Sequence, residues 1–73
     1  MATPTPAAQF AANVRRQRVR RGWTKEEAAW ACHLHPSAFG RIESGDRKPT
    51  LETIFRLAAG LEVPPAALFD GID

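Results

Sequence analysis

TKEEAAWACHLHPSAFGRIESG, residues 24–45, is the stretch that decides the fold of this chain. Its pattern predicts two short helices, over residues 24–32 and 36–44, separated by a three-residue corner at residues 33–35. The rest of the chain is expected to support that corner.

Capping residues mark both ends of these helices. Thr24 and Glu27 have the spacing of a capping box, in which each side chain bonds the other residue's backbone N–H. Pro36 suits the first position of the second helix, with His35 extended before it as the cap. Gly45 is placed to end that helix.

The two helices present distinct faces. Leu34 is the only apolar corner residue, so it should point inward. The helix before the corner has a small-residue face that lets another helix pack close: Ala28, Ala29 and Cys32. Phe39 and Ile42 form the predicted buried side of the second helix. Its opposite face holds Ser37, Gly40, Arg41 and Ser44. Small residues with one arginine suit a helix that presses against another surface, whereas a solvated helix would favour Glu, Lys and Gln.

Three more helices are predicted outside this stretch. The first covers residues 7–21, with Gly22 as its left-handed cap. Thr50 caps a helix over residues 51–60, and two prolines begin a last short helix over residues 64–69. No segment alternates with period two, so the fold class is all-α with five helices. Apolar residues keep helical spacing along the fourth helix and just beyond it: Leu51, Ile54, Phe55, Leu57, Ala58 and Leu61.

The length of 73 residues allows one domain, which we place at residues 7–73 after a disordered, proline-punctuated tail at residues 1–6. One cysteine excludes an internal disulfide framework, and the chain has neither a membrane-length apolar run nor a signal-peptide pattern. A cytoplasmic protein without membrane contact is therefore expected. Residues 1–48 carry a net charge of +5 and residues 49–73 a net charge of −3. This polarity suits a domain that turns one face toward a polyanion.

The chain resembles the Cro and phage-repressor type of helix-turn-helix domain, the XRE family. The resemblance covers residues 10–70 and rests on five pieces in order: VRxxR from Val14, GWTKEEAA from Gly22, RIESG from Arg41, PTLETIFRLAAGLEV from Pro49, and a final LF. It implies a lambda-repressor-like five-helix bundle that binds double-stranded DNA. The expected function is transcriptional regulation, for example as a repressor, by a homodimer on a two-fold related operator.

The resemblance also implies residue roles, with the helix at residues 36–44 in the major groove. Base-reading residues would be Ser37, Arg41 and Ser44, with Pro36 and Gly40 lining the groove. Thr24, Lys25, Arg47 and Lys48 would bind phosphates. Arg18 would form a partly buried ion pair with Glu43, in agreement with the need of an arginine on an apolar face for a partner.

Three departures from the family pattern affect these roles. His33 stands where Gly is usual, Pro36 replaces a polar reader, and Gly40 costs its helix roughly 1 kcal/mol relative to Ala. Direct readout would then depend mainly on Arg41 and Ser37, and specificity would either lean on DNA shape or be modest.

Trp30 leaves two interpretations open, a core residue or a contact with a partner. The second allows an alternative function, a protein-interaction adaptor or antitoxin with Trp30 as anchor. The dimer surface would be Trp30 or, by analogy, the group Val63, Pro64, Leu68 and Ile72. Cys32, His33 and His35 lack a fourth ligand, so no metal is expected. No cofactor is expected, and no constellation predicts an enzyme.

Overall fold

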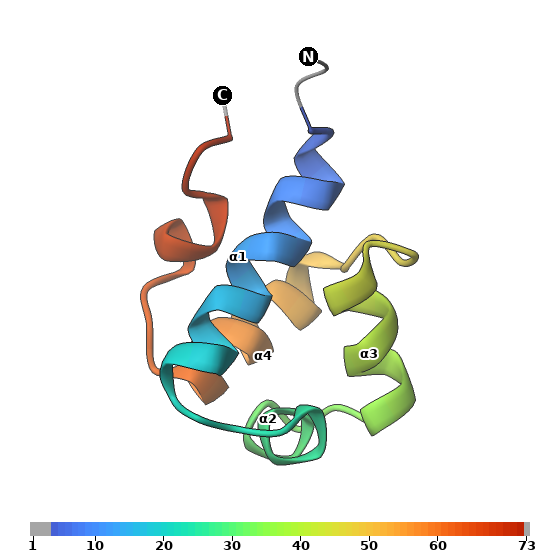
Figure 1. The fold of residues 1–73 in the computed structure, drawn as a ribbon, viewed down its shortest axis with the longest axis vertical. Coiled ribbons are helices and arrows are strands. Elements are labelled where there is room, and N and C mark those ends of the chain that lie inside the picture. Colours follow the sequence, from blue (N-terminus) through green and yellow to red (C-terminus); the bar gives the residue numbers. More distant parts are fainter. Residues whose placement is uncertain (1–3, 73) are drawn as a thin grey trace.

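The computed structural model describes residues 4–72 and contains four α-helices and one 3-10 helix over that range (Figure 1). In chain order they are α1 (Pro6–Arg20), α2 (Lys25–Ala31), α3 (Pro36–Ser44), α4 (Leu51–Leu61) and η1 (Pro65–Phe69). The all-helical prediction is confirmed for these residues. The predicted fifth α-helix is instead the 3-10 helix η1. Its segment is only five residues long, a length at which 3-10 helices are common, and it contains the bond from Ala67 N–H to Pro64 O at 2.9 Å.

The first helix begins one residue earlier than predicted. Thr5 is its N-cap, with the hydroxyl oxygen accepting from the N–H of Ala8 at 3.1 Å, and Pro6 takes the first helical position. The predicted tail at residues 1–6 therefore includes two residues that belong to the helix start, while residues 1–3 lie outside the described range. Gly22 has φ +69°, as a left-handed residue after the helix should.

The corner between α2 and α3 forms as the sequence predicts. Both bonds of the Thr24–Glu27 capping box are present. His33 adopts φ +55°, so a non-glycine residue does occupy the left-handed position. The His35 ring accepts from the N–H of Ser37 at 3.2 Å and caps α3, which ends at Gly45 with φ +83°.

The core lies where all five elements meet. In Figure 1, α4 passes behind α1, while α2 and α3 close the lower and right sides and the η1 segment lies at the left. The buried apolar residues are Phe10, Ala11, Val14, Ala28, Ala29, Cys32, Phe39, Ile42, Leu57, Ala58, Leu61 and Leu68. The predicted inner faces of α2 and α3 are thus confirmed, and Leu34 packs partly buried against them.

The apolar face of α4 is only partly covered. Leu57, Ala58 and Leu61 are buried, but Leu51 is 72% exposed and Phe55 is 56% exposed. Helical spacing places these residues near one side, yet the neighbouring elements cover only part of it. No helix within residues 4–72 has the length and apolar character to cross a membrane.

Gly60 allows α4 to pack closely on α2. A Cβ at this position would lie 2.6 Å from both the Ala31 carbonyl oxygen and the Cys32 Sγ. The Ala31 carbonyl oxygen is a backbone atom and has little room to move away from such a Cβ. The absence of a side chain at Gly60 therefore sets the distance between the two helices.

A buried amide joins the two ends of the domain. Asn13 is fully buried, and its Nδ2 donates to the carbonyl oxygens of Leu68 at 2.9 Å and Asp70 at 2.8 Å. Its Oδ1 accepts from Gln9 at 3.1 Å and Arg16 at 2.9 Å. The side chain therefore holds η1 against α1 with its hydrogen-bonding capacity used.

Candidate functional site

The outward face of α3 is the centre of the candidate site. Ser37, Arg41 and Ser44 are exposed on it, and Gly40 is half-buried between them. Arg41 forms no ion pair with any residue in the described range. The helix thus presents one long cation among short side chains, as the sequence predicts.

Gly40 has no role in packing within the protein. A Cβ added there would meet no atom within 4 Å, in contrast to the crowded surroundings of Gly60. Its backbone is also helical, so a left-handed conformation does not require glycine. The protein alone gives no reason for this destabilising residue in the middle of α3.

The predicted ion pair between Arg18 and Glu43 is present. Arg18 Nε lies 2.8 Å from Glu43 Oε2, and Arg18 Nη2 lies 2.8 Å from Glu43 Oε1. The third nitrogen, Nη1, donates to the carbonyl oxygen of Trp23 at 2.8 Å. The hydrogen bond to Glu43 raises the pKa of Arg18 against the opposing effect of burial. The pair joins α1 to the C-terminal half of α3 and thereby fixes the tilt of the exposed face.

Several cations lie around α3 without an acidic partner. Lys25, Arg41, Arg47 and Lys48 are exposed and form no ion pair with another residue of the range 4–72. Arg15 and Arg20 in α1 are also exposed and unpaired over that range, but Arg20 lines a hollow beside η1. The remaining arginines each contact an acidic residue. The three cations predicted to bind phosphate are therefore all available to an anion.

The three hydroxyl residues predicted to contact DNA are partly engaged in local hydrogen bonds. Thr24 uses its hydroxyl oxygen and its N–H within the capping box. The Ser44 hydroxyl lies 3.0 Å from the carbonyl oxygen of Arg41 and 3.1 Å from Asp46 Oδ2. A base contact by Ser44 would compete with these local bonds. Ser37 lies in the first turn of α3, and its hydroxyl is also engaged locally, 2.8 Å from the His35 ring.

The predicted partner residues divide into exposed and buried ones. Trp30 is 73% exposed, so its interpretation as a core residue is wrong. Leu68 is fully buried, so its prediction as a dimer contact is wrong, because η1 turns this side chain into the core between α1 and α4. Pro64 is exposed, and Val63 and Ile72 are partly buried against the core.

Cys32 behaves as a small core residue. It is fully buried, and burial raises the pKa of its thiol to about 11. A metal ligand would need the opposite, a readily formed thiolate. Within residues 4–72, no three His, Cys, Asp or Glu side chains gather in a way that could hold a metal ion.

Comparison with known proteins gives consistent matches. The profile of a helix-turn-helix domain family matches residues 9–69. The restriction-modification controller protein C.AhdI from Aeromonas hydrophila is 32% identical with a TM-score of 0.83, over 86% of this chain and 96% of that chain. The hypothetical transcription factor NHTF from Neisseria is 30% identical with a TM-score of 0.85, over 94% and 83% of the two chains.

A curated relative matches in sequence as well. The HTH-type transcriptional regulator SutR from Escherichia coli (strain K12) is 36% identical over 47 residues, which is 64% of this chain. The matched part is 26% of the length of SutR.

Proposed function

The chain belongs to the helix-turn-helix domain family, of the XRE type, and from that premise we propose that it regulates transcription by binding a specific double-stranded DNA sequence. DNA binding in transcription regulation is the common character of this class, and the matched relatives are named as regulators, a controller protein and a transcription factor. None of these names describes an enzyme.

The exposed face of α3 carries the proposal. A helix with side chains fits the major groove of B-DNA, and its N-terminal residues then lie nearest the base edges. Arg41 is free of ion pairs within the described residues and reaches out among short side chains, so its guanidinium can bond O6 and N7 of a guanine. We assign Ser37 as the second reader, since it lies in the first turn of α3.

The exposed cations of the two segments next to α3 would hold the DNA backbone. Lys25 lies at the start of α2, while Arg47 and Lys48 lie in the loop after α3. Phosphate contacts from both segments would fix the register of α3 in the groove without reading sequence. Binding should therefore weaken steeply as salt rises.

We further propose a homodimer on a two-fold related operator, with half-sites about one helical turn apart. Pro64 is exposed, and Val63 and Ile72 keep part of their apolar surface accessible near it in sequence. These three residues are the proposed dimer contact. A sedimentation measurement of the free protein, compared with a Pro64→Glu variant, tests it; a wild-type monomer at all concentrations would exclude a stable dimer in the absence of DNA.

Selection of bound sites from a random DNA pool is the decisive experiment. We expect an enriched sequence that repeats with two-fold symmetry. Arg41→Ala should reduce the preference for that sequence over random DNA by about 1–3 kcal/mol, whereas Lys25→Ala should weaken binding to both DNAs alike. An equal loss on both DNAs for Arg41→Ala would remove it from the readers.

Trp30 supports a second candidate, a protein-interaction module such as an adaptor or antitoxin. Its exposed ring borders a hollow of about 370 Å³ that is also lined by Leu34 and Pro36, and large exposed aromatic residues often anchor partners. A titration against random duplex DNA at two salt concentrations separates the candidates. Absence of any salt-dependent binding would favour the protein partner.

A further inference from the structure

A small notch lies where α1, α2 and α3 meet, at the edge of the exposed face of α3 described above. It has a volume of about 220 Å³ and is lined by Arg15, Arg18, Lys25, Glu43 and Ser44. Arg15 comes from α1 and Lys25 from α2, so packing alone brings these two cations to one place.

Among residues 4–72, Glu43 is the only carboxylate that lines the notch, and it is already neutralised. Both oxygens of Glu43 bond Arg18 at 2.8 Å, and the Glu43 side chain is 4% exposed. Arg15 and Lys25 are exposed and have no ion pair with a residue in the described range. The lining therefore carries an excess of two positive charges, Arg15 and Lys25, over a compensated pair.

We propose that this notch binds one phosphate of the DNA backbone and that Arg15 is a phosphate contact together with Lys25. The inference rests on the proposed function. Because a helix with its side chains is about 10–12 Å wide and the major groove about 12 Å, seating α3 in the groove brings a phosphate strand along its flank. Ser44 belongs to the outward face of α3 and also lines the notch, so the notch lies along that flank.

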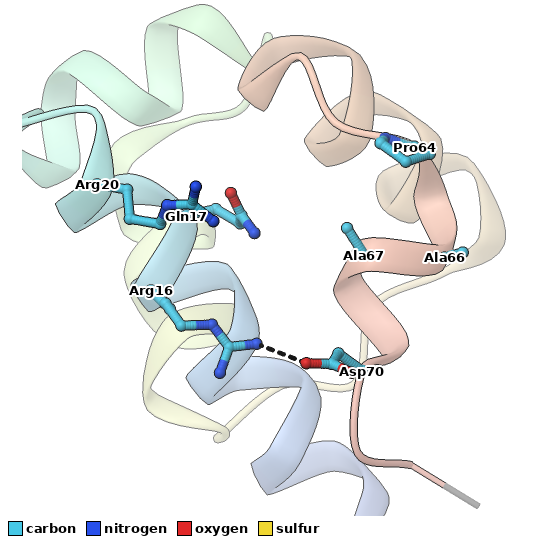
Figure 2. A pocket seen from close by; sticks show the side chains of 7 residues that line it. All are labelled: Arg16, Gln17, Arg20, Pro64, Ala66, Ala67 and Asp70. Carbon is cyan, nitrogen blue, oxygen red and sulfur yellow. Dashed lines mark hydrogen bonds and ion pairs between the residues drawn. The ribbon is translucent and has the colours of Figure 1, made fainter.

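The sequence alone does not identify Arg15 among the five arginines of residues 15–21, because they are spread around the helix. Tertiary packing separates them. Arg16 and Arg20 line a different hollow, together with Asp70 and residues of the η1 segment (Figure 2). Its volume is about 410 Å³. Arg20 is thus a matched control for Arg15: the same helix, the same side-chain type and exposure class, and no ion pair within residues 4–72, but a different face.

The test compares Arg15→Gln with Arg20→Gln in binding to a random-sequence DNA duplex over a series of salt concentrations. Loss of one phosphate contact should lower the slope of log K against log salt by about 0.9, equivalent to about a fivefold loss of affinity near 0.15 M salt. We expect that change for Arg15→Gln, with the same factor on the selected operator, and no change for Arg20→Gln. Equal behaviour of the two variants, or a loss confined to the operator, would overturn the inference.

A double variant tests whether Arg15 and Lys25 share a phosphate. If they do, Arg15→Gln combined with Lys25→Gln should lose less than the product of the two single losses. If the loss of affinity in the double variant equals the product of the two single losses, Arg15 and Lys25 contact separate phosphates. That result would overturn the proposal of a shared notch. Wild-type protein without salt-dependent binding would refute the proposed function itself, whereas normal wild-type binding with an unaffected Arg15→Gln variant refutes only this assignment.

Discussion

Replacement of Gly40 by alanine should stabilise the free protein and weaken its binding to DNA. The two effects have opposite signs because they have different origins. In the free protein a Cβ at this position meets no atom within 4 Å, so only the helix-forming tendency changes. In the proposed complex the same Cβ would occupy the space through which the backbone of α3 approaches the groove.

The stability gain follows from helix propensity. Glycine inside a helix is about 0.5–1 kcal/mol less favourable than alanine, and Gly40 lies in the interior of α3 with Pro36 and Ser44 at its ends. For a domain of this size, such a gain corresponds to a rise of about 2–8 °C in Tm. Thermal unfolding followed by circular dichroism, with urea unfolding as a second measurement, would record it.

The loss of DNA affinity would come from steric contact. Forcing one extra carbon into a close-packed surface typically costs about 1–3 kcal/mol, so G40A should bind the selected operator at least about fivefold more weakly. Fluorescence anisotropy with the selected operator measures this loss of affinity directly. The same titration with random DNA shows whether the steric contact requires α3 to be seated in the groove of its operator.

The matched control is Gly60→Ala, which makes the same substitution at the glycine inside α4. Its Cβ would clash with Ala31 and Cys32, so this variant should lose stability, in contrast to Gly40→Ala. A G40A protein that is less stable than wild type would contradict the open surroundings of Gly40. A G40A protein that binds the operator with undiminished affinity would refute the close approach of α3 to DNA.

Three further outcomes follow from burial in the core and at the ion pair. Glu43→Ala should cost about 3–5 kcal/mol of unfolding free energy in urea, since it leaves the Arg18 guanidinium poorly hydrated and without its carboxylate; a loss below about 1 kcal/mol would show that the pair is not structurally important. Leu68→Ala should cost about 2–5 kcal/mol, whereas Trp30→Ala should change stability by no more than about 0.5 kcal/mol, and the reverse order would contradict the burial of these two side chains. Burial raises the pKa of Cys32 to about 11 from an ordinary 9.0, so the folded state retains a proton that the unfolded chain releases. The contribution of this thiol to the free energy of unfolding is therefore fully present below pH 9.0 and should be lost as the pH rises toward 11. In urea unfolding measured at alkaline pH, the Cys32→Ala variant should not show that loss.

Much of the candidate site could be predicted from the sequence because its frame depends on local bonds. The capping box at Thr24 and the His35 cap use partners within a few residues, and the left-handed His33 reflects a corner that the chain must turn. The pair of Arg18 and Glu43 came from the family resemblance together with the cost of an unpaired buried charge. The roles of Arg41, Lys25 and the other contact residues with DNA stay predictions.

Other features depended on which surface each element meets. Analogy with the family placed Leu68 in a dimer contact and the sequence left Trp30 open, but packing buries the leucine and leaves the tryptophan 73% exposed. It left the partners of Asn13 unassigned, because the carbonyls that it bonds lie 55 and 57 residues away in the chain. Helical spacing identifies sides of a helix but not which side its neighbours will cover.

Residues 24–45 show this division within one stretch. The sequence alone determined that two short helices form there and how each begins and ends. Helix caps are hydrogen bonds between residues close in the chain, and a left-handed corner is a backbone conformation of a single residue. Only the tertiary structure decided that Gly40 faces open space while Gly60 supports a helix contact, and that Arg15 rather than Arg20 lies beside Lys25. The physical reason is that the surroundings of a side chain are set by elements distant in sequence, whose packing no local pattern specifies.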